Sequence, residues 1–146
     1  MQGITGINEK TRLKMSLCTK SYCANSVNYC VFNSNEVSIP YALALLNSKL
    51  LNFIFKLQST NSNVNGYEVN NLPIAISSNK TKYEDLVNKV LTYRRDDNIN
   101  SALKIENLID LLVYRLYGLT YNEVLIVDPD TPITEEEYNN EGERNE

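Results

Sequence analysis

The stretch Ile39–Leu57, IPYALALLNSKLLNFIFKL, sets the first expectation for the fold, because its apolar residues recur at helical spacing. Residues spaced three or four apart share one face of a helix, and here they form an apolar stripe. Pro40 suits the first turn, where its missing N–H leaves no hydrogen bond unmade. We therefore predict one amphipathic helix across the whole stretch. The stripe comprises Leu43, Leu46, Leu50, Phe53, Ile54 and Leu57, and the opposite side comprises Lys49, Asn52 and Lys56.

Upstream of this helix the pattern changes from helical spacing to alternation. Arg12–Cys18 places its apolar residues on one face and its polar residues on the other, as in a half-buried strand. Val27–Phe32 is rich in β-branched and aromatic residues and is flanked by turn-prone asparagine and serine. Two strands are therefore predicted, with Cys30 in the core of the second.

A polar, asparagine-rich loop, Gln58–Asn71, follows the predicted helix. Within it, Tyr67–Val69 is expected to pair briefly as a strand. Leu72–Ile76 is expected to be extended, because Pro73 cannot occupy the interior of a helix.

The second half of the chain has the pattern of helices. Thr81 and Glu84 fit a capping box at the start of one helix, which should end near RRDDN. Another should start near Asn100 or Ser101 and run to Tyr117.

An elbow is expected directly after this helix. Gly118 is placed to take the left-handed conformation that closes a helix. Thr120 and Glu123 then fit a second capping box, so a short helix should run from Thr120 to Asp128 at a fixed angle to the preceding one.

Together these elements predict an α+β fold: a small mixed or antiparallel sheet with a packed amphipathic helix, followed by a C-terminal helical elbow. The expected organisation is a strand-rich lobe over residues 1–76, a helical region over 77–128 and a disordered acidic tail over 129–146. No apolar run reaches the roughly 20 residues of a membrane span, and the start lacks the features of a signal peptide. A cytoplasmic protein is expected.

Composition excludes several kinds of catalysis. The chain has no histidine, so Ser-His and Cys-His nucleophile pairs cannot form within it. It has neither a Walker A loop nor GxGxxG. Cys18, Cys23 and Cys30 favour reduced thiols, and a three-thiolate metal site would lack a fourth ligand. Asp128–Asp130, DPD, is interpreted as a turn rather than a metal-binding carboxylate pair. No catalytic residue, metal or cofactor is expected here.

The net charge of −4 conceals an uneven distribution. Residues 1–72 carry six basic and three acidic side chains, a net charge of +3, and the remainder carries −7. An acidic chain argues against a free-standing nucleic-acid binder, but a basic first half argues less strongly against one.

Five phrases, in order over about residues 2–128, resemble the C-terminal specificity domain of TaqI-like adenine DNA methyltransferases and fused type IIG restriction-modification enzymes. The most telling is YALALLNSKLLNFIF, which is similar to the family's LLNSKL helix. The phrases are QGITGINEKTRLKMSL at Gln2–Leu17, NSVNYCVF at Asn25–Phe32, YALALLNSKLLNFIF at Tyr41–Phe55, NLPI at Asn71–Ile74 and IDLLVYRLYGLTYNEVLIVD at Ile109–Asp128.

The resemblance implies a DNA sequence-recognition domain that is a C-terminal fragment of a restriction-modification enzyme. Such enzymes transfer a methyl group from S-adenosylmethionine to adenine N6. The catalytic NPPY and the cofactor-binding glycine loop are absent here, which implies a methyltransferase domain upstream. The expected partners are double-stranded DNA and that domain. The alternative is a protein–protein module, such as half of a type I restriction specificity subunit, in which LLNSKL also occurs.

Candidate DNA contacts lie in the expected turns of the basic half. Phosphate contacts fix the register of a protein on DNA, and an asparagine amide can pair with both edge groups of adenine. The alternative is that the lysines are surface residues in contact only with water, and that the asparagines cluster only because asparagine is abundant throughout the chain. The candidates are Lys10, Arg12, Lys14, Lys20, Tyr22, Asn61, Asn63 and Asn65.

Overall fold

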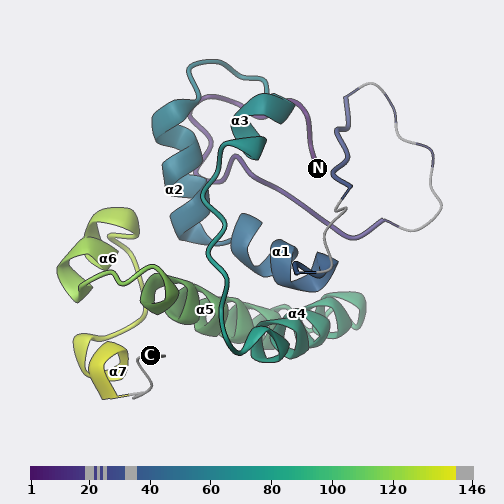
Figure 1. Ribbon diagram of the computed structural model, residues 1–146. Helices are drawn as coiled ribbons and strands as arrows, with labels where there is room; N and C mark the ends of the chain where they lie inside the picture. Colours follow the sequence, from purple (N-terminus) through teal and green to yellow (C-terminus); the bar gives the residue numbers. More distant parts are fainter. Residues whose placement is uncertain (19–21, 23, 25, 32–35, 141–146) are drawn as a thin grey trace. The chain divides into compact units, whose positions relative to one another are not determined.

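The computed structural model describes residues 1–18, 22, 24, 26–31 and 36–140. The chain divides into two compact units, Met1–Ile74 and Ala75–Glu146, called here the N-terminal unit and the C-terminal unit (Figure 1). The described residues form seven α-helices and no sheet. None of these helices has the length and hydropathy needed to cross a membrane.

The predicted α+β fold is wrong, because the described segments contain no paired strands. The pairing between Gln2 and Val27 and that between Ile4 and Asn63 are isolated bridges. Alternating apolar residues favour an extended backbone, but a strand also needs a neighbouring strand to pair its N–H and C=O groups. Among the described residues, no such neighbouring strand is present.

Two of the predicted strands are irregular, and the third is helical. Arg12–Cys18 has no regular secondary structure. The same holds for the described part of the second predicted strand, Val27–Val31, apart from the bridge at Val27, and Phe32 lies outside the described residues. Tyr67–Val69 is helical and lies within α3 (Gly66–Asn70).

The predicted helix Ile39–Leu57 is in fact two helices. α1 spans Ile39–Leu46 and α2 spans Lys49–Gln58, with Pro40 in the first turn of α1 as predicted. The break falls at Ser48, whose hydroxyl accepts a hydrogen bond from the N–H of Leu51 at 3.2 Å. Serine is favoured at this capping position, because its side chain accepts a hydrogen bond from an N–H group that has no partner within the helix.

The buried set of α1 and α2 differs from the predicted stripe. Ile54 is half-buried and Leu57 is 72% exposed, whereas Leu51 and Phe55 are fully buried. The break changes the phase between the two helices, so one continuous stripe cannot describe both. The buried apolar residues are Tyr41, Ala42, Leu43, Ala44, Leu45, Leu46, Leu50, Leu51 and Phe55.

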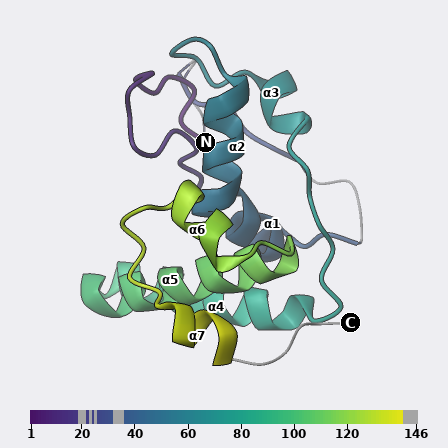
Figure 2. The same ribbon diagram turned by 90° about the vertical axis from the view of Figure 1, so that its left-hand side faces the viewer.

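The C-terminal unit is built on a pair of helices, α4 (Lys80–Arg95) and α5 (Ile99–Leu116), which lie side by side (Figures 1 and 2). Asn79 caps α4 by accepting a hydrogen bond from the N–H of Lys82. The capping box predicted at Thr81 is therefore wrong, and the cap lies two residues earlier.

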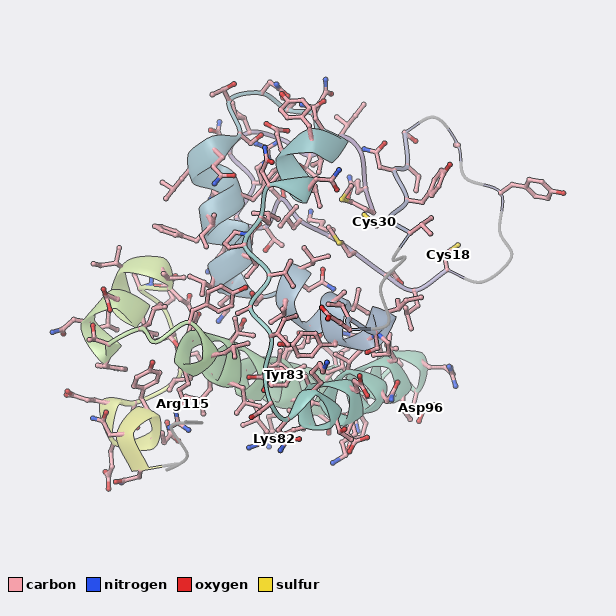
Figure 3. All side chains as sticks on the ribbon, in the orientation of Figure 1. Cys18, Cys30, Lys82, Tyr83, Asp96 and Arg115 are labelled. Atoms are coloured by element: carbon pink, nitrogen blue, oxygen red, sulfur yellow. The ribbon has the colours of Figure 1, made fainter. Side chains whose placement is uncertain are left out.

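Contacts near both ends of α4 show that the two helices are antiparallel. The hydroxyl of Tyr83, labelled in Figure 3, donates to the carbonyl of Leu112 at 3.2 Å. Near the other end of α4, Arg94 forms a two-pronged ion pair with Glu106, with N–O distances of 2.8 and 2.9 Å.

The predicted elbow is confirmed. Gly118 has φ +70° and ends α5, and α6 (Tyr121–Val127) starts immediately afterwards. The backbone N–H of Thr120 donates to the Glu123 carboxylate at 2.7 Å, and the Thr120 hydroxyl accepts from the N–H of Glu123. Hydrogen bonds from the backbone and side chain of Thr120 lower the pKa of the Glu123 carboxyl.

The segment after the elbow is more ordered than its composition predicts. Asp128–Asp130 is a turn, as expected, but α7 (Glu135–Asn140) lies inside the predicted disordered tail. Ile133 and Tyr138 are buried, and the Tyr138 hydroxyl donates to the carbonyl of Leu119. Two apolar anchors thus hold an otherwise acidic stretch, which a count of charged residues does not reveal. Residues 141–146 lie outside the described part.

The core assignment of α2 leads to a stability prediction. Leu51→Ala removes a fully buried side chain and should lower the free energy of unfolding by about 2–5 kcal/mol. Leu57→Ala makes the same chemical change at an exposed position on the same helix and should cost less than about 0.5 kcal/mol. Denaturant unfolding of the full chain measures both. Equal losses would contradict the helix break at Ser48.

Gly118 provides a test of the elbow. A Cβ atom there would meet no atom within 4 Å, so a substitution is opposed by backbone strain alone. Gly118→Val should lower the free energy of unfolding by roughly 1–2 kcal/mol, and Gly118→Asn by less, because asparagine tolerates the left-handed conformation. Thermal and denaturant unfolding provide the measurement. A valine variant as stable as wild type would show that the elbow does not need positive φ.

Candidate nucleic-acid interface

The side-chain amide of Asn52 holds an irregular segment of the N-terminal unit in place. Its oxygen accepts from the backbone N–H groups of Arg12 at 2.7 Å and Leu13 at 3.1 Å. Its nitrogen donates to the carbonyl of Lys10 at 3.0 Å. Asn52 is itself buried in α2. One side chain therefore pairs three backbone groups that a neighbouring strand would otherwise satisfy.

Asn47 repeats this pairing at the joint between the two helices. Its oxygen accepts from the N–H of Met15 at 2.9 Å, and its nitrogen donates to the carbonyl of the same residue at 3.0 Å. The asparagine of the LLNSKL phrase thus fixes an upstream segment, while the neighbouring serine caps α2.

The position of the Arg12 side chain follows from this anchoring. Arg12 is 1% exposed, and its guanidinium donates four hydrogen bonds. Nε reaches the hydroxyl of Thr5 at 3.2 Å, and Nη1 reaches the hydroxyl of Ser59 at 3.1 Å. Nη2 reaches the carbonyls of Asn61 at 2.6 Å and Asn63 at 3.3 Å. The guanidinium therefore joins two segments that lie far apart in sequence.

The ring of Phe55 covers the guanidinium, with 5.3 Å from the guanidinium carbon to the ring centroid. Among the described residues, no carboxylate pairs with Arg12. Its charge is compensated by neutral oxygens and by an aromatic face.

Backbone hydrogen bonds connect the same two segments. The N–H of Thr5 donates to the carbonyl of Ser62 at 2.9 Å, and the N–H of Val64 donates to the carbonyl of Gly3 at 2.9 Å. The exposed residues on either side form two adjoining loops, Gly6–Thr11 and Thr60–Asn63, which we call the paired-loop surface. Figure 2 shows the first of these loops, in purple, beside α2, and the second above the end of that helix.

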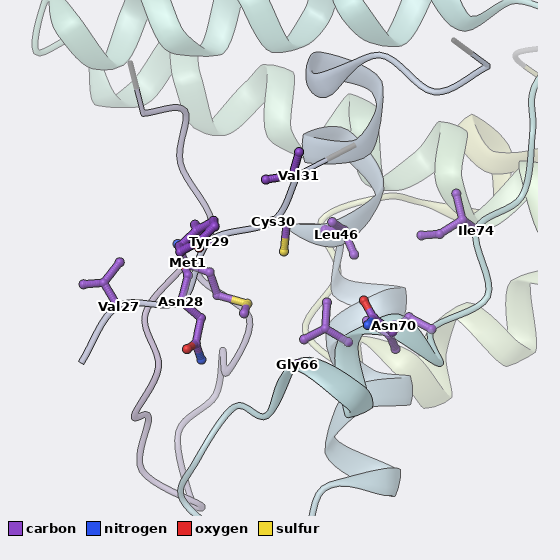
Figure 4. A pocket seen from close by; sticks show the side chains of 12 residues that line it. Met1, Val27, Asn28, Tyr29, Cys30, Val31, Leu46, Gly66, Asn70 and Ile74 are labelled. Atoms are coloured by element: carbon purple, nitrogen blue, oxygen red, sulfur yellow. Dashed lines mark hydrogen bonds between the residues drawn. The ribbon is translucent and has the colours of Figure 1, made fainter. Parts of the chain in front are cut away.

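A separate pocket of about 530 Å³ lies in the same unit (Figure 4). Its lining is mainly apolar and includes Leu46, Val69 and Leu72, with Tyr29 and Cys30 on one wall. Cys30 is exposed, and so is Cys18 (Figure 3), which corrects the prediction that Cys30 is a core strand residue. The described residues contain no cluster of cysteine or acidic side chains able to hold a metal ion.

One tyrosine in the C-terminal unit has an unusual environment. The Tyr114 hydroxyl is buried and has no hydrogen-bond partner among the described residues. Burial, followed by the nearby Asp110 and Asp128 carboxyls, raises the pKa of Tyr114 above its usual value. The side chain is therefore neutral and acts as part of the core rather than as an acid or base.

Residues 5–74 match the family model described as the TaqI-like C-terminal specificity domain. These residues belong to that family. The match ends at Ile74, the last residue of the N-terminal unit, and includes both loops and the network around Arg12. No curated protein and no solved structure shows significant similarity to the chain.

A specificity domain of this family implies recognition of a DNA target in a restriction-modification methyltransferase. The match does not reach Ile109–Asp128, so the resemblance of that phrase stays a prediction.

The specificity domain brings together four of the predicted DNA contacts. Lys10, Asn61 and Asn63 are exposed on the paired-loop surface. Lys14 is exposed beside it and pairs with Glu9 of the first loop at 3.4 Å. The oxygen of the Asn61 side chain accepts from the N–H of Asn63 at 2.8 Å, which leaves its amide nitrogen outside that hydrogen bond.

The other candidates differ. Arg12 is buried and its guanidinium donates four hydrogen bonds, so the structure does not present it on the paired-loop surface. Asn65 is half-buried, and its amide donates to Glu68 at 2.9 Å within a cap. Tyr22 is fully exposed, but no described contact connects it to the paired-loop surface. Lys20 lies outside the described residues.

Sequence reasoning missed Lys56 as a candidate. It is exposed in the last turn of α2, shortly before the second loop. Its spacing placed it on the solvent side of a helix, where lysines are common. The predicted boundary between helix and loop, at Leu57 and Gln58, already placed it near the loop, and α2 ends at Gln58.

The amide network can be tested through the backbone that it holds. Asn52→Ala leaves the N–H groups of Arg12 and Leu13 and the carbonyl of Lys10 without their partner. We expect faster hydrogen exchange at those two amides and a loss of about 1–3 kcal/mol of stability. Asn70→Ala, at an exposed residue of α3, is the control and should change neither. Unchanged exchange in the Asn52 variant would contradict the role assigned to its amide.

Proposed function

We propose that this chain is the DNA sequence-recognition part of a restriction-modification adenine methyltransferase and positions the enzyme on its target site. The observation that supports this most strongly is the coincidence of two boundaries. The specificity-domain match covers residues 5–74, and the N-terminal unit ends at the same residue. The matched segment therefore covers all but the first four residues of a compact unit that has its own exposed loops.

The paired-loop surface has the chemistry that such a function needs. It presents amide side chains from Asn61 and Asn63 and a cation from Lys10. In the proposed complex, Lys10, Lys14 and Lys56 contact phosphates and set the register, and the asparagine amides read base edges in the major groove.

The charge of the chain fits a domain that depends on a larger assembly. The N-terminal unit carries six basic and three acidic residues, a net charge of only +3. Phosphate contacts supply most of the non-specific affinity for DNA, so this unit alone should bind weakly. We propose that an upstream methyltransferase domain binds S-adenosylmethionine, transfers the methyl group to adenine N6 and contributes further contacts to the duplex.

Fluorescence anisotropy with a labelled duplex tests this placement. A Lys10→Ala/Lys14→Ala/Lys56→Ala variant of the full chain should bind more weakly than wild type at low salt. Each phosphate contact contributes about −0.9 to the slope of log affinity against log salt, so the wild-type slope should be no steeper than roughly −3 from these three lysines. The variant should show a shallower slope.

A variant with the same change of charge in the C-terminal unit is the control. Lys82→Ala/Lys89→Ala/Lys104→Ala also removes three exposed lysines. It should leave the affinity and the salt slope nearly unchanged. If both triple variants lose affinity equally, the attraction comes from overall charge, and the DNA face is not the paired-loop surface. If wild type fails to bind duplex DNA at low salt, the proposed function itself is wrong.

A further inference from the structure

We propose that Arg12, although shielded from DNA, controls sequence discrimination by fixing the shape of the Thr60–Asn63 loop. This makes Arg12 a positioning residue rather than a contact. The inference rests on the proposed function, because it concerns how the same surface distinguishes one DNA sequence from another.

Arg12 is the main support of that loop. Three of its four hydrogen bonds reach the loop or the residue before it, through the Ser59 hydroxyl and the carbonyls of Asn61 and Asn63. These carbonyls face the buried guanidinium, while the side chains of the same two asparagines are exposed. The guanidinium therefore fixes the backbone from which both amides project.

The other constraints on the loop are fewer. The Ser62 carbonyl accepts from Thr5, and the N–H of Asn63 donates to the Asn61 side chain. The loop contains no helix, and the Thr5–Ser62 hydrogen bond belongs to the isolated bridge between Ile4 and Asn63, whose other hydrogen bond joins Val64 to Gly3. Without Arg12, the hydrogen bonds to the carbonyls of Asn61 and Asn63 and to the Ser59 hydroxyl are lost together.

Holding a loop with a buried cation has an unfavourable free-energy contribution. Removing a charge from water costs free energy, and neutral acceptors repay it less well than a carboxylate does. The arrangement therefore contributes geometry more than stability. Only a guanidinium supplies donors spread across a planar fork, whereas the single ammonium nitrogen of lysine donates from one point. Arg12→Lys keeps the charge and loses the fork.

This difference separates discrimination from general attraction. Phosphate attraction depends on charge, which Arg12→Lys preserves. Base readout depends on the placement of the amides, and each two-point contact contributes roughly 5- to 150-fold discrimination against a wrong base. We therefore expect Arg12→Lys to reduce discrimination about tenfold at the base pairs read by the asparagines. The affinity for an unselected duplex should change much less.

The experiment uses the full chain and a pool of duplexes with a randomised central segment. Bound duplexes are recovered and sequenced, and the enrichment of each base at each position is compared between wild type and Arg12→Lys. Anisotropy with one unselected duplex measures general attraction and its salt slope. Asn63→Ala, which removes an exposed amide with no hydrogen bond of its own among the described contacts, reports the loss of a direct contact.

A double variant decides how Arg12 acts. If Arg12 works through the loop amides, Arg12→Lys should add little to the loss already caused by Asn63→Ala at the same base pairs. Full additivity at those positions would overturn the inference. So would an Arg12→Lys variant with the enrichment pattern of wild type. If wild type itself enriches no sequence, the proposed function fails, whatever Arg12 does.

Ser59→Ala keeps the test decisive if Arg12→Lys does not fold. It removes one acceptor of the guanidinium and leaves the cation in place. Its enrichment should fall between those of wild type and Asn63→Ala, with unchanged affinity for the unselected duplex. An enrichment pattern equal to that of wild type in a folded Ser59→Ala variant would overturn the inference.

Discussion

The Asn52 amide is the interaction on which the rest of the N-terminal unit depends. It pairs three backbone groups of the segment around Arg12. It therefore takes the place of the neighbouring strand that the alternating apolar and polar residues of that segment predict. Once the backbone of Arg12 is held, its guanidinium lies within reach of the loop that follows α2. A buried side chain of one helix thus determines where two exposed loops meet.

The sequence predicted what is determined locally. Gly118 and the Thr120–Glu123 capping box lie within a few residues of the groups that they satisfy, so the elbow could be predicted from spacing alone. Pro40 and the C-terminal ends of α4 and α5 were predicted from local signals in the same way, whereas the cap of α4 was not. The break at Ser48 was also local, but the apolar stripe continued through it and concealed the cap.

The missing sheet had a different cause. The alternation in Arg12–Cys18 correctly marked a non-helical segment, but its partners are side chains 32 to 40 residues further along the chain. Periodicity carries no information about such partners. The same limit explains why the sequence does not predict that Arg12 is buried. A basic residue in a basic stretch suggests exposure, and nothing nearby predicts four acceptors and an aromatic ring around it.

The resulting picture separates support from readout. Buried polar side chains hold the backbone of the paired-loop surface, and the side chains of Lys10 and Asn63 on that surface are exposed. Under the proposed function, such an arrangement would allow the exposed residues to change, and the target with them, while the framework stays the same. The C-terminal unit has its own framework, in which α7 packs through Tyr138 beside the elbow.

Backbone amide chemical shifts, recorded while a duplex is added to the isotope-labelled chain, test the central claim most directly. The account predicts that the largest changes fall on Gly6–Thr11 and Thr60–Asn63, with small changes throughout α4 and α5. Changes concentrated in the C-terminal unit, or around the pocket lined by Val69 and Leu72, would contradict it.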